Sequence, residues 1–350
     1  MRMAIMGVGS LGIIIGALIT EGKQNVDLID ANRENVKALN ENGAQITGII
    51  EKNVKVNALT PEQIKGEYDL VFLLTKQVYN EKALNQLLPH LHENSVVCTL
   101  QNGVPEDKVS SIVGKNRTIG GAVGFGATWL RPGVSELTTK WSIVQKYAFD
   151  IGELNGEITT RVQKIAEILN LVGHCKVSDH ILGIKWAKLL MNSTFSGMSA
   201  ALGCTFGDVL YNEKAMYSLA CIADETIKVA HGLGITLPPM QGKDFEFLEL
   251  KDESDIPNKM DFYKEVWNPH VNLKASMLQD LEKRKKTEID YINGYVSAKG
   301  KLVGVKTPYN DLVVKLVKQA EEQKVVPDFF VNIDKFERLK NNGTNYGIAK

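Results

Sequence analysis

Residues 1–22 narrow the choice of fold more than any other part of the chain. They read MRMAIMGVGSLGIIIGALITEG, with Arg2 as the only charged residue before Glu21. The stretch resembles the front of a secretory signal, but a signal core is an uninterrupted apolar helix that ends in a small-x-small cleavage site. Here glycines stand at positions 7, 9, 12 and 16, and each glycine inside a helix would cost about 1 kcal/mol relative to alanine. The glycines therefore indicate a structural turn rather than an export signal.

A short strand followed directly by a helix explains this turn. Met3–Met6 is an apolar run of strand length, and Leu11–Thr20 has the length and the apolar face of a helix. The pattern G-x-G-x-x-G lies between them, and a second apolar run, Val26–Ile29, ends at Asp30. A strand, a glycine turn, a helix and an acidic residue about 20 positions later form the dinucleotide-binding fingerprint of a Rossmann domain.

Each glycine of the turn has its own reason in this fingerprint. Gly7 permits the tight turn, Gly9 lets a pyrophosphate approach the backbone, and Gly12 allows the helix to pack close to the strand. The start of the helix offers unpaired N–H groups and a positive dipole end to the phosphates. We therefore predict that the cofactor is bound by the turn residues Gly7, Val8, Gly9, Ser10, Leu11 and Gly12.

Asp30 predicts the choice of cofactor. A carboxylate at the end of the second strand accepts hydrogen bonds from the ribose hydroxyls and repels a 2′-phosphate, which favours NAD over NADP. Arg33 follows closely in the sequence and could hold that phosphate instead. NAD is the favoured cofactor, and NADP stays open.

The chain divides into an α/β half and a helical half. We expect strands at 68–74, 95–100, 119–123, 134–137 and 147–151, a hairpin at 46–59, and helices at 80–88 and 158–171. This alternation predicts a doubly wound parallel sheet. Later segments have helical spacing, at 181–202, 214–233, 272–281, 287–302 and 310–323.

The predicted domains are a dinucleotide-binding Rossmann domain at 1–180, an all-helical substrate-binding and catalytic domain at 181–340, and a frayed tail at 341–350. Residues 241–270 are charged and contain Pro257 and Pro269. They predict a long loop or lid.

Composition excludes several classes of function. Lys plus Arg and Asp plus Glu both number 41, so no overall field attracts nucleic acid or an anionic membrane. No later apolar stretch approaches the roughly 20 residues of a membrane span. The four cysteines show no C-x-x-C pair, which predicts neither a disulfide framework nor a metal site. We expect a cytoplasmic protein that binds no metal, no nucleic acid and no membrane.

Two other segments carry polar residues where apolar helices are expected. Lys188, Asn192 and Ser196 are spaced i, i+4 and i+8, so on an α-helix they share one stripe. Polar groups on a buried helix need partners, although spacing alone allows Lys188 to be a surface lysine with a packed stem. Thr287 and Asp290 resemble a capping box, which puts Glu288 in the first turn of a helix. There Glu288 need do no more than complement the helix dipole.

At these residues the chain resembles the ketopantoate reductases and their relatives among the D-2-hydroxyacid dehydrogenases. The resemblance spans nearly the whole sequence. It is carried by S-M-L-Q-D at Ser276, T-E-I-D-Y-I-N-G around Glu288, K-x-x-x-N at Lys188, the Q-N-G turn at Asn102 and the strand-end Lys76. It implies an N-terminal Rossmann domain, a helical C-terminal domain and a substrate held between them.

The resemblance also implies a role for each residue. Lys188 would be the general acid, and Glu288 would hold the lysine and a substrate hydroxyl. Ser276 would bind the substrate carboxylate, while Asn102, Asn192 and Ser196 would line the pocket. Lys76 and Asn102 would contact the cofactor.

The chain departs from the family pattern at two places. Members usually carry a second asparagine followed by proline where this chain has Ser196-Gly197. Many have arginine near the end of the second strand, where this chain has Asp30-Ala31. The first change puts a contact to the ketopantoate hydroxyl in question.

The leading hypothesis is reduction of a 2-oxo acid by NAD(P)H, with 2-dehydropantoate (ketopantoate) to D-pantoate as the foremost reaction, a step of pantothenate biosynthesis. One alternative is an NAD-dependent dehydrogenase for branched or aromatic D-2-hydroxy acids such as D-mandelate. Another is a dinucleotide-sensing protein without turnover. A homodimer through the helical half is compatible with the family.

Overall fold

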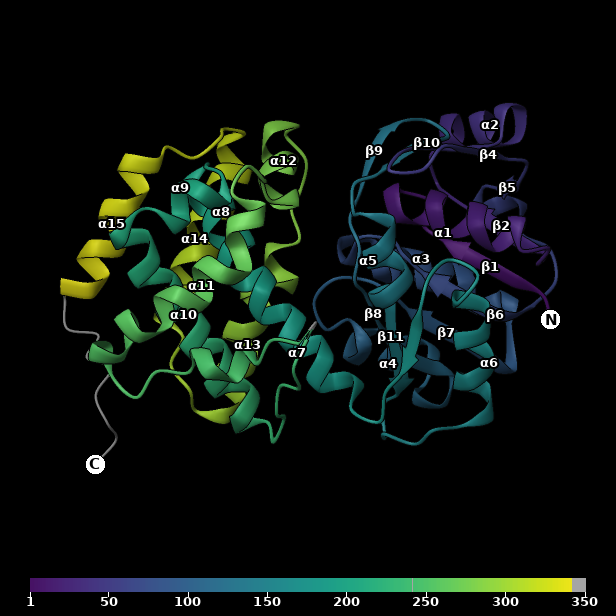
Figure 1. Ribbon diagram of the computed structural model, residues 1–350. Coiled ribbons are helices and arrows are strands. Elements are labelled where there is room, and N and C mark those ends of the chain that lie inside the picture. Colours follow the sequence, from purple (N-terminus) through teal and green to yellow (C-terminus); the bar gives the residue numbers. More distant parts are fainter. Residues whose placement is uncertain (241, 342–350) are drawn as a thin grey trace. The chain divides into compact units, whose positions relative to one another are not determined.

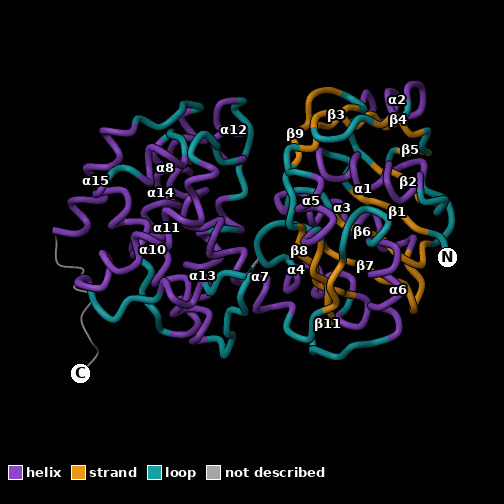
Figure 2. The backbone as a smooth tube through the Cα atoms, in the orientation of Figure 1, coloured by secondary structure: helices purple, strands orange, loops and turns teal. Residues whose placement is uncertain are grey.

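A computed structural model of the chain describes residues 1–240 and 242–341. The chain divides into two compact units, Met1–Leu182 and Gly183–Lys350 (Figure 1). The first unit combines strands and helices, and the second is built of helices (Figure 2). The predicted fold class, a doubly wound α/β half followed by a helical half, is confirmed.

The larger sheet of the first unit has the strand order β12-β11-β8-β7-β6-β1-β2-β5. In chain order its strands are β1 (Met3–Met6), β2 (Val26–Ile29), β5 (Asn57–Leu59), β6 (Tyr68–Leu73), β7 (Leu91–Thr99), β8 (Thr118–Val123), β11 (Phe149–Glu153) and β12 (Cys175–Val177). Its strand pairs are parallel except for β8 with β11. The chain order reverses between β1 and β6, and in such sheets ligands bind beyond the carboxyl ends of the strands at this switch point.

A smaller sheet has the order β4-β3-β10-β9. Its strands are β3 (Ala44–Gly48), β4 (Lys52–Val54), β9 (Ala127–Arg131) and β10 (Val134–Leu137). The predicted hairpin at 46–59 is right for β3 and β4, which pair antiparallel. It is wrong for its last strand, because β5 leaves the hairpin and pairs with β2 in the larger sheet.

The helix α1 (Ser10–Glu21) contacts strands of both sheets, and every residue from Gly12 to Ile19 is buried. This position explains the apolar stretch that resembles an export signal. A helix enclosed by protein on all sides has no polar face. The remaining helices of this unit are α2 (Arg33–Asn42), α3 (Asn80–Leu87), α4 (Glu106–Val113), α5 (Trp141–Tyr147) and α6 (Thr160–Leu169).

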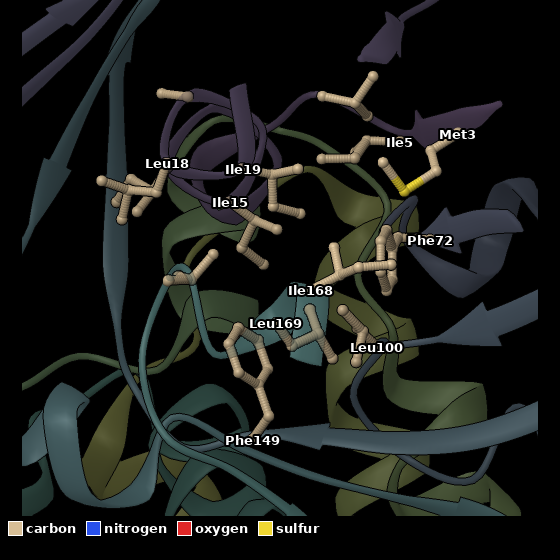
Figure 3. Packing of buried hydrophobic residues seen from close by; sticks show 14 of the residues in the cluster. Met3, Ile5, Ile15, Leu18, Ile19, Phe72, Leu100, Phe149, Ile168 and Leu169 are labelled. Carbon is tan, nitrogen blue, oxygen red and sulfur yellow. The ribbon is translucent and has the colours of Figure 1, made fainter. Parts of the chain in front are cut away.

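Both faces of the larger sheet are packed against helices. Along β1, Met3 and Ile5 enter one core with side chains of α1 and α6, and Ala4 and Met6 enter a second core with α3 and α4. Figure 3 shows the first core, where the same cluster contains Ile15, Ile19, Phe72, Phe149, Ile168 and Leu169. A strand buried on both faces reads as a continuous apolar run, which is why β1 could be predicted.

The second unit is helical. Its helices are α7 (Ile181–Met191), α8 (Gly197–Leu202), α9 (Phe206–Leu210), α10 (Glu213–Gly232), α11 (Ile256–Trp267), α12 (Ser276–Glu282), α13 (Asn293–Val303), α14 (Pro308–Gln323) and α15 (Phe329–Asn341). A π-helical turn, Asn192–Ser196, joins α7 to α8. In the described part of the chain, each helix is too short or too polar to cross a bilayer.

The prediction of a long loop at 241–270 is wrong for the residues that the structure describes, which exclude position 241. Most of the segment forms α11 and three short 3-10 turns. Pro257 stands in the first turn of α11, where the missing N–H costs nothing. Trp267 is buried and its ring stacks on Phe195, with centroids 4.4 Å apart. The segment therefore packs its buried side chains against the core of the helical unit.

Candidate active site

The glycine turn follows β1 at the switch point of the larger sheet. Gly7 has a φ of 100°, and a Cβ there would lie 2.5 Å from the backbone nitrogen of Thr75. A Cβ on Gly12 would lie 2.3 Å from the carbonyl oxygen of Gly7. Apart from Gly9 itself and its two chain neighbours, no described residue has an atom within 4 Å of a Cβ built on Gly9. Packing therefore requires glycine at 7 and 12, whereas Gly9 leaves an open approach to the backbone.

The start of α1 is prepared for an anion. Gly9 is its N-cap residue and supplies no side chain to cap the first N–H groups, and the first turn contains no acidic residue. A helix N-terminus in this state presents N–H donors and the positive end of the dipole. With the open side of Gly9, these features fit the pyrophosphate of a dinucleotide.

Asp30 follows β2 and is tied to the glycine turn. Its Oδ2 accepts hydrogen bonds from the Val8 N–H at 3.0 Å and from the Asn35 amide at 3.3 Å. Its Oδ1 accepts from the Asn32 N–H at 2.8 Å. The carboxylate is therefore held in one orientation beside the turn.

Asn35 is a supporting residue that the sequence did not reveal. Its buried amide donates to the Val8 carbonyl at 2.8 Å as well as to Asp30, and its Oδ1 accepts from the Gly133 N–H at 2.8 Å. One side chain thus links the glycine turn, Asp30 and the β9–β10 hairpin. No spacing pattern distinguishes this asparagine from a surface residue of α2.

Lys76 and Asn102 follow the neighbouring strands β6 and β7. Lys76 is partly exposed and Asn102 is exposed. Gln77 donates from Nε2 to the Asn102 carbonyl at 2.6 Å, and Gln101 donates to the Thr75 carbonyl at 2.6 Å. These buried amides join the two loops at the same end of the sheet as Gly7, whose missing Cβ faces Thr75.

The amides of Gln101 and Asn80 both support these loops, but only one of them is marked by a sequence motif. Gln101 belongs to the Q-N-G turn, so a signal for it was present. Asn80, which accepts from Gln101 Nε2 at 2.6 Å, stands at the start of α3 with nothing in the sequence to mark it.

In the second unit, Lys188, Asn192 and Ser196 lie on one helical run. Within 183–202 the partly exposed residues are these three and Met191, and all others are buried. The π-helical turn changes the geometry from the predicted α-helix, and the Gly197 N–H donates to the Asn192 carbonyl to close it. Residues four apart on an α-helix differ by about 40° around the axis. A π turn winds less per residue, so it offsets the drift that a continuous α-helix would accumulate between Lys188 and Ser196.

Asn192 carries an unsatisfied donor. Its Nδ2 is buried and has no hydrogen-bond acceptor among the described residues. A buried polar group without a partner is costly, and such groups in native proteins call for an explanation. A ligand oxygen beside this partly exposed stripe would satisfy the amide.

Ser276 and Glu288 lie on two other segments of the second unit. Ser276 is exposed and is the first residue of α12. Glu288 is partly exposed and precedes a 3-10 turn, Ile289–Tyr291. α13 begins later than the predicted helix, at Asn293.

The predicted capping box at Thr287 is wrong. The Thr287 hydroxyl donates to Glu321 at 2.6 Å and accepts from the Ile289 N–H at 3.2 Å, while Asp290 pairs with Lys318 at 2.6 Å. The long-range partner on α14 replaces the local cap. It fixes the backbone on which Glu288 stands.

The predicted site residues thus form two groups. The turn 7–12, Asp30, Lys76 and Asn102 gather at one end of the sheet in the first unit. Lys188, Asn192, Ser196, Ser276 and Glu288 belong to the second unit.

Two family models match the chain, one in each half. The model described as "Ketopantoate reductase PanE/ApbA" matches residues 3–149, and that described as "Ketopantoate reductase PanE/ApbA C terminal" matches residues 180–321. The chain belongs to the ketopantoate reductase family. The family predicted from the sequence motifs is therefore confirmed.

Individual relatives extend this assignment over almost the full chain. A 2-dehydropantoate 2-reductase of Pyrococcus horikoshii is 30% identical over 327 residues, which cover 92% of this chain and 98% of the relative. The protein of the same name from Pyrococcus abyssi is 32% identical with the same coverage. A structure of D-mandelate dehydrogenase with NADH and anilino(oxo)acetate matches with a TM-score of 0.79 at 27% identity, over 93% of this chain and 99% of that one.

Proposed function

We propose that this ketopantoate reductase family member reduces a 2-oxo acid to a D-2-hydroxy acid with NAD(P)H, and that 2-dehydropantoate is the foremost substrate. The glycine turn carries the proposal, because Gly9 leaves the backbone open at an uncapped helix start. The 2-dehydropantoate 2-reductases that match at 30% and 32% identity support the choice of substrate.

The first unit would bind the cofactor. Residues 7–12 would hold the pyrophosphate through backbone N–H groups, and Lys76 and Asn102 would contact the cofactor from the neighbouring loops. Asp30 would accept hydrogen bonds from the adenosine ribose, which favours NAD, and Arg33 keeps NADP open. When bound, the nicotinamide supplies the hydride. The roles of 1–180 as the cofactor domain and 181–340 as the substrate domain belong to this proposal.

The second unit would supply the proton and hold the acid. Hydride addition to the carbonyl carbon builds negative charge on its oxygen. The Lys188 ammonium would stabilise that charge and then donate a proton to the oxygen. Glu288 would orient Lys188 and a substrate hydroxyl. Ser276 would bind the substrate carboxylate.

Asn192 and Ser196 would offer polar groups to the substrate from the second unit, and Asn102 would offer one from the first. The Asn192 amide nitrogen supports this role because it is buried and has no acceptor among the described residues. A substrate oxygen would give it one.

An aromatic or branched 2-oxo acid is the second candidate substrate. The similarity to D-mandelate dehydrogenase, with a TM-score of 0.79 and 27% identity, favours it. Serine at position 196 has a shorter side chain than asparagine, which leaves room for a larger substituent.

The homodimer expected from the family stays a prediction that size-exclusion chromatography with light scattering would test.

A substrate panel tests the proposal. Purified protein is mixed with NADH or NADPH and with 2-dehydropantoate, 2-oxo-3-methylbutanoate or 2-oxo-2-phenylacetate, and the nicotinamide absorbance is followed. We expect consumption with 2-dehydropantoate, faster with NADH. Faster turnover of 2-oxo-2-phenylacetate would select the second candidate. Cofactor binding without turnover of any acid would indicate the sensing protein.

A further inference from the structure

The π-helical turn between α7 and α8 is supported by side-chain donors. Thr194 Oγ1 donates to the Leu190 carbonyl at 2.7 Å, and Ser193 Oγ donates to the same carbonyl at 3.2 Å. Asn293 Nδ2 donates to the Ser193 carbonyl at 2.9 Å. π-helical turns are rare and often occur at functional sites. Of these three donors, Asn293 is the one that reaches the turn from another helix.

Asn293 is itself held in place by a buried chain of hydrogen bonds. Its Nδ2 also donates to Asn310 Oδ1 at 2.9 Å, and Asn310 Nδ2 donates to Glu225 Oε2 at 2.7 Å. The Glu225 carboxylate accepts the backbone N–H groups of Tyr309 and Asn310 at 2.9 Å each, at the start of α14. These four residues are at most 1% exposed. In so buried a network, displacing one amide would leave several groups unpaired.

Asn293 also contacts the end of the π turn. A Cβ on Gly197 would lie 2.7 Å from Asn293 Oδ1 and 3.0 Å from its Nδ2. The N–H of the same Gly197 donates to the Asn192 carbonyl and closes the turn. The Asn293 amide therefore touches the turn at its middle and at its end.

We propose that Asn293 is a positioning residue that holds the π turn and thereby keeps Asn192 and Ser196 aligned with Lys188 for the 2-oxo acid. Its catalytic consequence rests on the proposed function. Without the amide, the Ser193 carbonyl would lose this donor in a buried position. Relaxation of the turn to α-helical register would rotate one side against the other by up to about 100°. Ser196 would then lie about 80° around the helix axis from Lys188, because eight residues at about 100° each exceed two full turns by that angle.

The first test is Asn293→Ala. We expect kcat/KM for the 2-oxo acid to fall by about 10²-fold, the usual cost of a small misplacement in a site. The KM for the acid should rise, while NADH affinity, measured by fluorescence titration, stays within about two-fold because that site lies in the other unit.

Asn332→Ala is the matched control. Asn332 is buried on α15, and its Nδ2 donates to the Ala201 carbonyl of α8 at 2.8 Å. The variant removes the same kind of bond from the same helical run, away from the π turn. We expect a similar loss of Tm with unchanged KM and kcat. Equal kinetic effects of the two variants would overturn the proposal, because they would reflect stability alone.

Gly197→Ala tests the contact from the other side. The new methyl group should displace the Asn293 amide and reproduce the raised KM. In the Asn293→Ala background the clash is gone, so the same substitution should add little. Fully additive losses in the double variant would contradict a shared mechanism.

Hydrogen exchange separates this proposal from the proposed function. We expect the amides of 190–200 to exchange faster in Asn293→Ala than in Asn332→Ala. If the wild type reduces no 2-oxo acid, the proposed function fails. The exchange rates of the amides of 190–200 then still test whether Asn293 holds the turn. Identical exchange in both variants would overturn that role.

Discussion

The helix α1 and the α7–α8 run (181–202) are both largely buried, yet in the proposed function they contribute to the site by different means. In α1 the contribution comes from the backbone at the helix start, where Gly9 leaves an open approach. In the α7–α8 run it comes from side chains in the middle of a buried segment, where Lys188, Asn192 and Ser196 are partly exposed. A site formed by backbone N–H groups depends on small residues and on the backbone dihedral angle φ at the turn. A side-chain site depends on helical register, and in this chain a distant asparagine contacts the turn that sets it.

Substitution of the proposed proton donor should give the largest effect. Lys188→Ala should lower kcat by roughly 10²- to 10⁴-fold, the usual contribution of a positioned general acid. NADH affinity should not change, because the proposed cofactor site is the backbone site of the other unit. Steady-state kinetics and fluorescence titration measure the two quantities.

The matched control for Lys188 is Lys301→Ala, an exposed lysine on α13. It should keep wild-type kcat. Near wild-type turnover by Lys188→Ala would remove the lysine from the mechanism and leave the α7–α8 run with a structural role only.

Paired glycine variants test the backbone site. Gly9→Ala should keep the wild-type Tm, since its Cβ meets no described atom, but should weaken NADH binding by about 10-fold by blocking the approach of the pyrophosphate. Gly12→Ala should lower both Tm and affinity, because its Cβ would lie 2.3 Å from the Gly7 carbonyl oxygen. If Gly9→Ala binds NADH normally, the open side of the turn is not the phosphate site.

The proposed preference of the backbone site for NAD over NADP rests on one side chain. Asp30→Ala should raise the preference for NADPH over NADH by about 10-fold, because the carboxylate that repels the 2′-phosphate is gone. The ratio of kcat/KM for the two cofactors measures it. An unchanged ratio would mean that Asp30 only accepts the hydrogen bonds from Val8 and Asn35 and does not select the cofactor.

A stability test in the first unit should give the smallest effect. Arg161 donates to both carboxylate oxygens of Glu153 at 2.7 and 2.6 Å, and Thr159 donates at 2.6 Å. Burial raises the pKa of the Glu153 carboxyl, but the hydrogen bonds from Arg161 and Thr159 and the Arg161 charge outweigh it, so the pKa lies below its ordinary value. Because the pKa is lowered on folding, the ionised pair stabilises the fold at pH values above the unfolded-state pKa. This stabilisation is lost as the pH falls through the folded-state pKa.

Glu153→Gln should therefore lower the Tm by about 2–4 °C at neutral pH. The difference from wild type should shrink below about pH 4, near the ordinary pKa of glutamate. Kinetic constants at neutral pH should not change. A Tm difference that is constant down to pH 3 would contradict the account of this pair.

The two regions also differ in how far the sequence reveals them. The glycine spacing predicts β1, α1 and β2 because it reports backbone geometry that few other residues can adopt. The π turn was not predicted, since an apolar run with polar residues four apart looks the same whether the bonds are i→i+4 or i→i+5. Asn293 was missed because its partner Ser193 is 100 residues away.

The predictions of a loop at 241–270 and of a capping box at Thr287 were wrong because the local sequence allowed two structures in each case. Pro257 favours a break in the local sequence, but it stands in the first turn of α11, where a helix accepts proline. Thr287 and Asp290 have the spacing of a local cap, but their partners lie on α14. In each case a tertiary contact or a position within an element decided between two readings that the local sequence allowed.

Isotope transfer tests the central claim most directly. 2-Dehydropantoate is reduced with NADH deuterated at C4 on the transferred face, and the product is analysed by NMR and chiral chromatography. The account predicts D-pantoate with one deuterium at C2, and loss of this product in Lys188→Ala. If the wild type forms no deuterated D-2-hydroxy acid from this or any other 2-oxo acid, the proposal that the chain is a hydride-transferring reductase is contradicted.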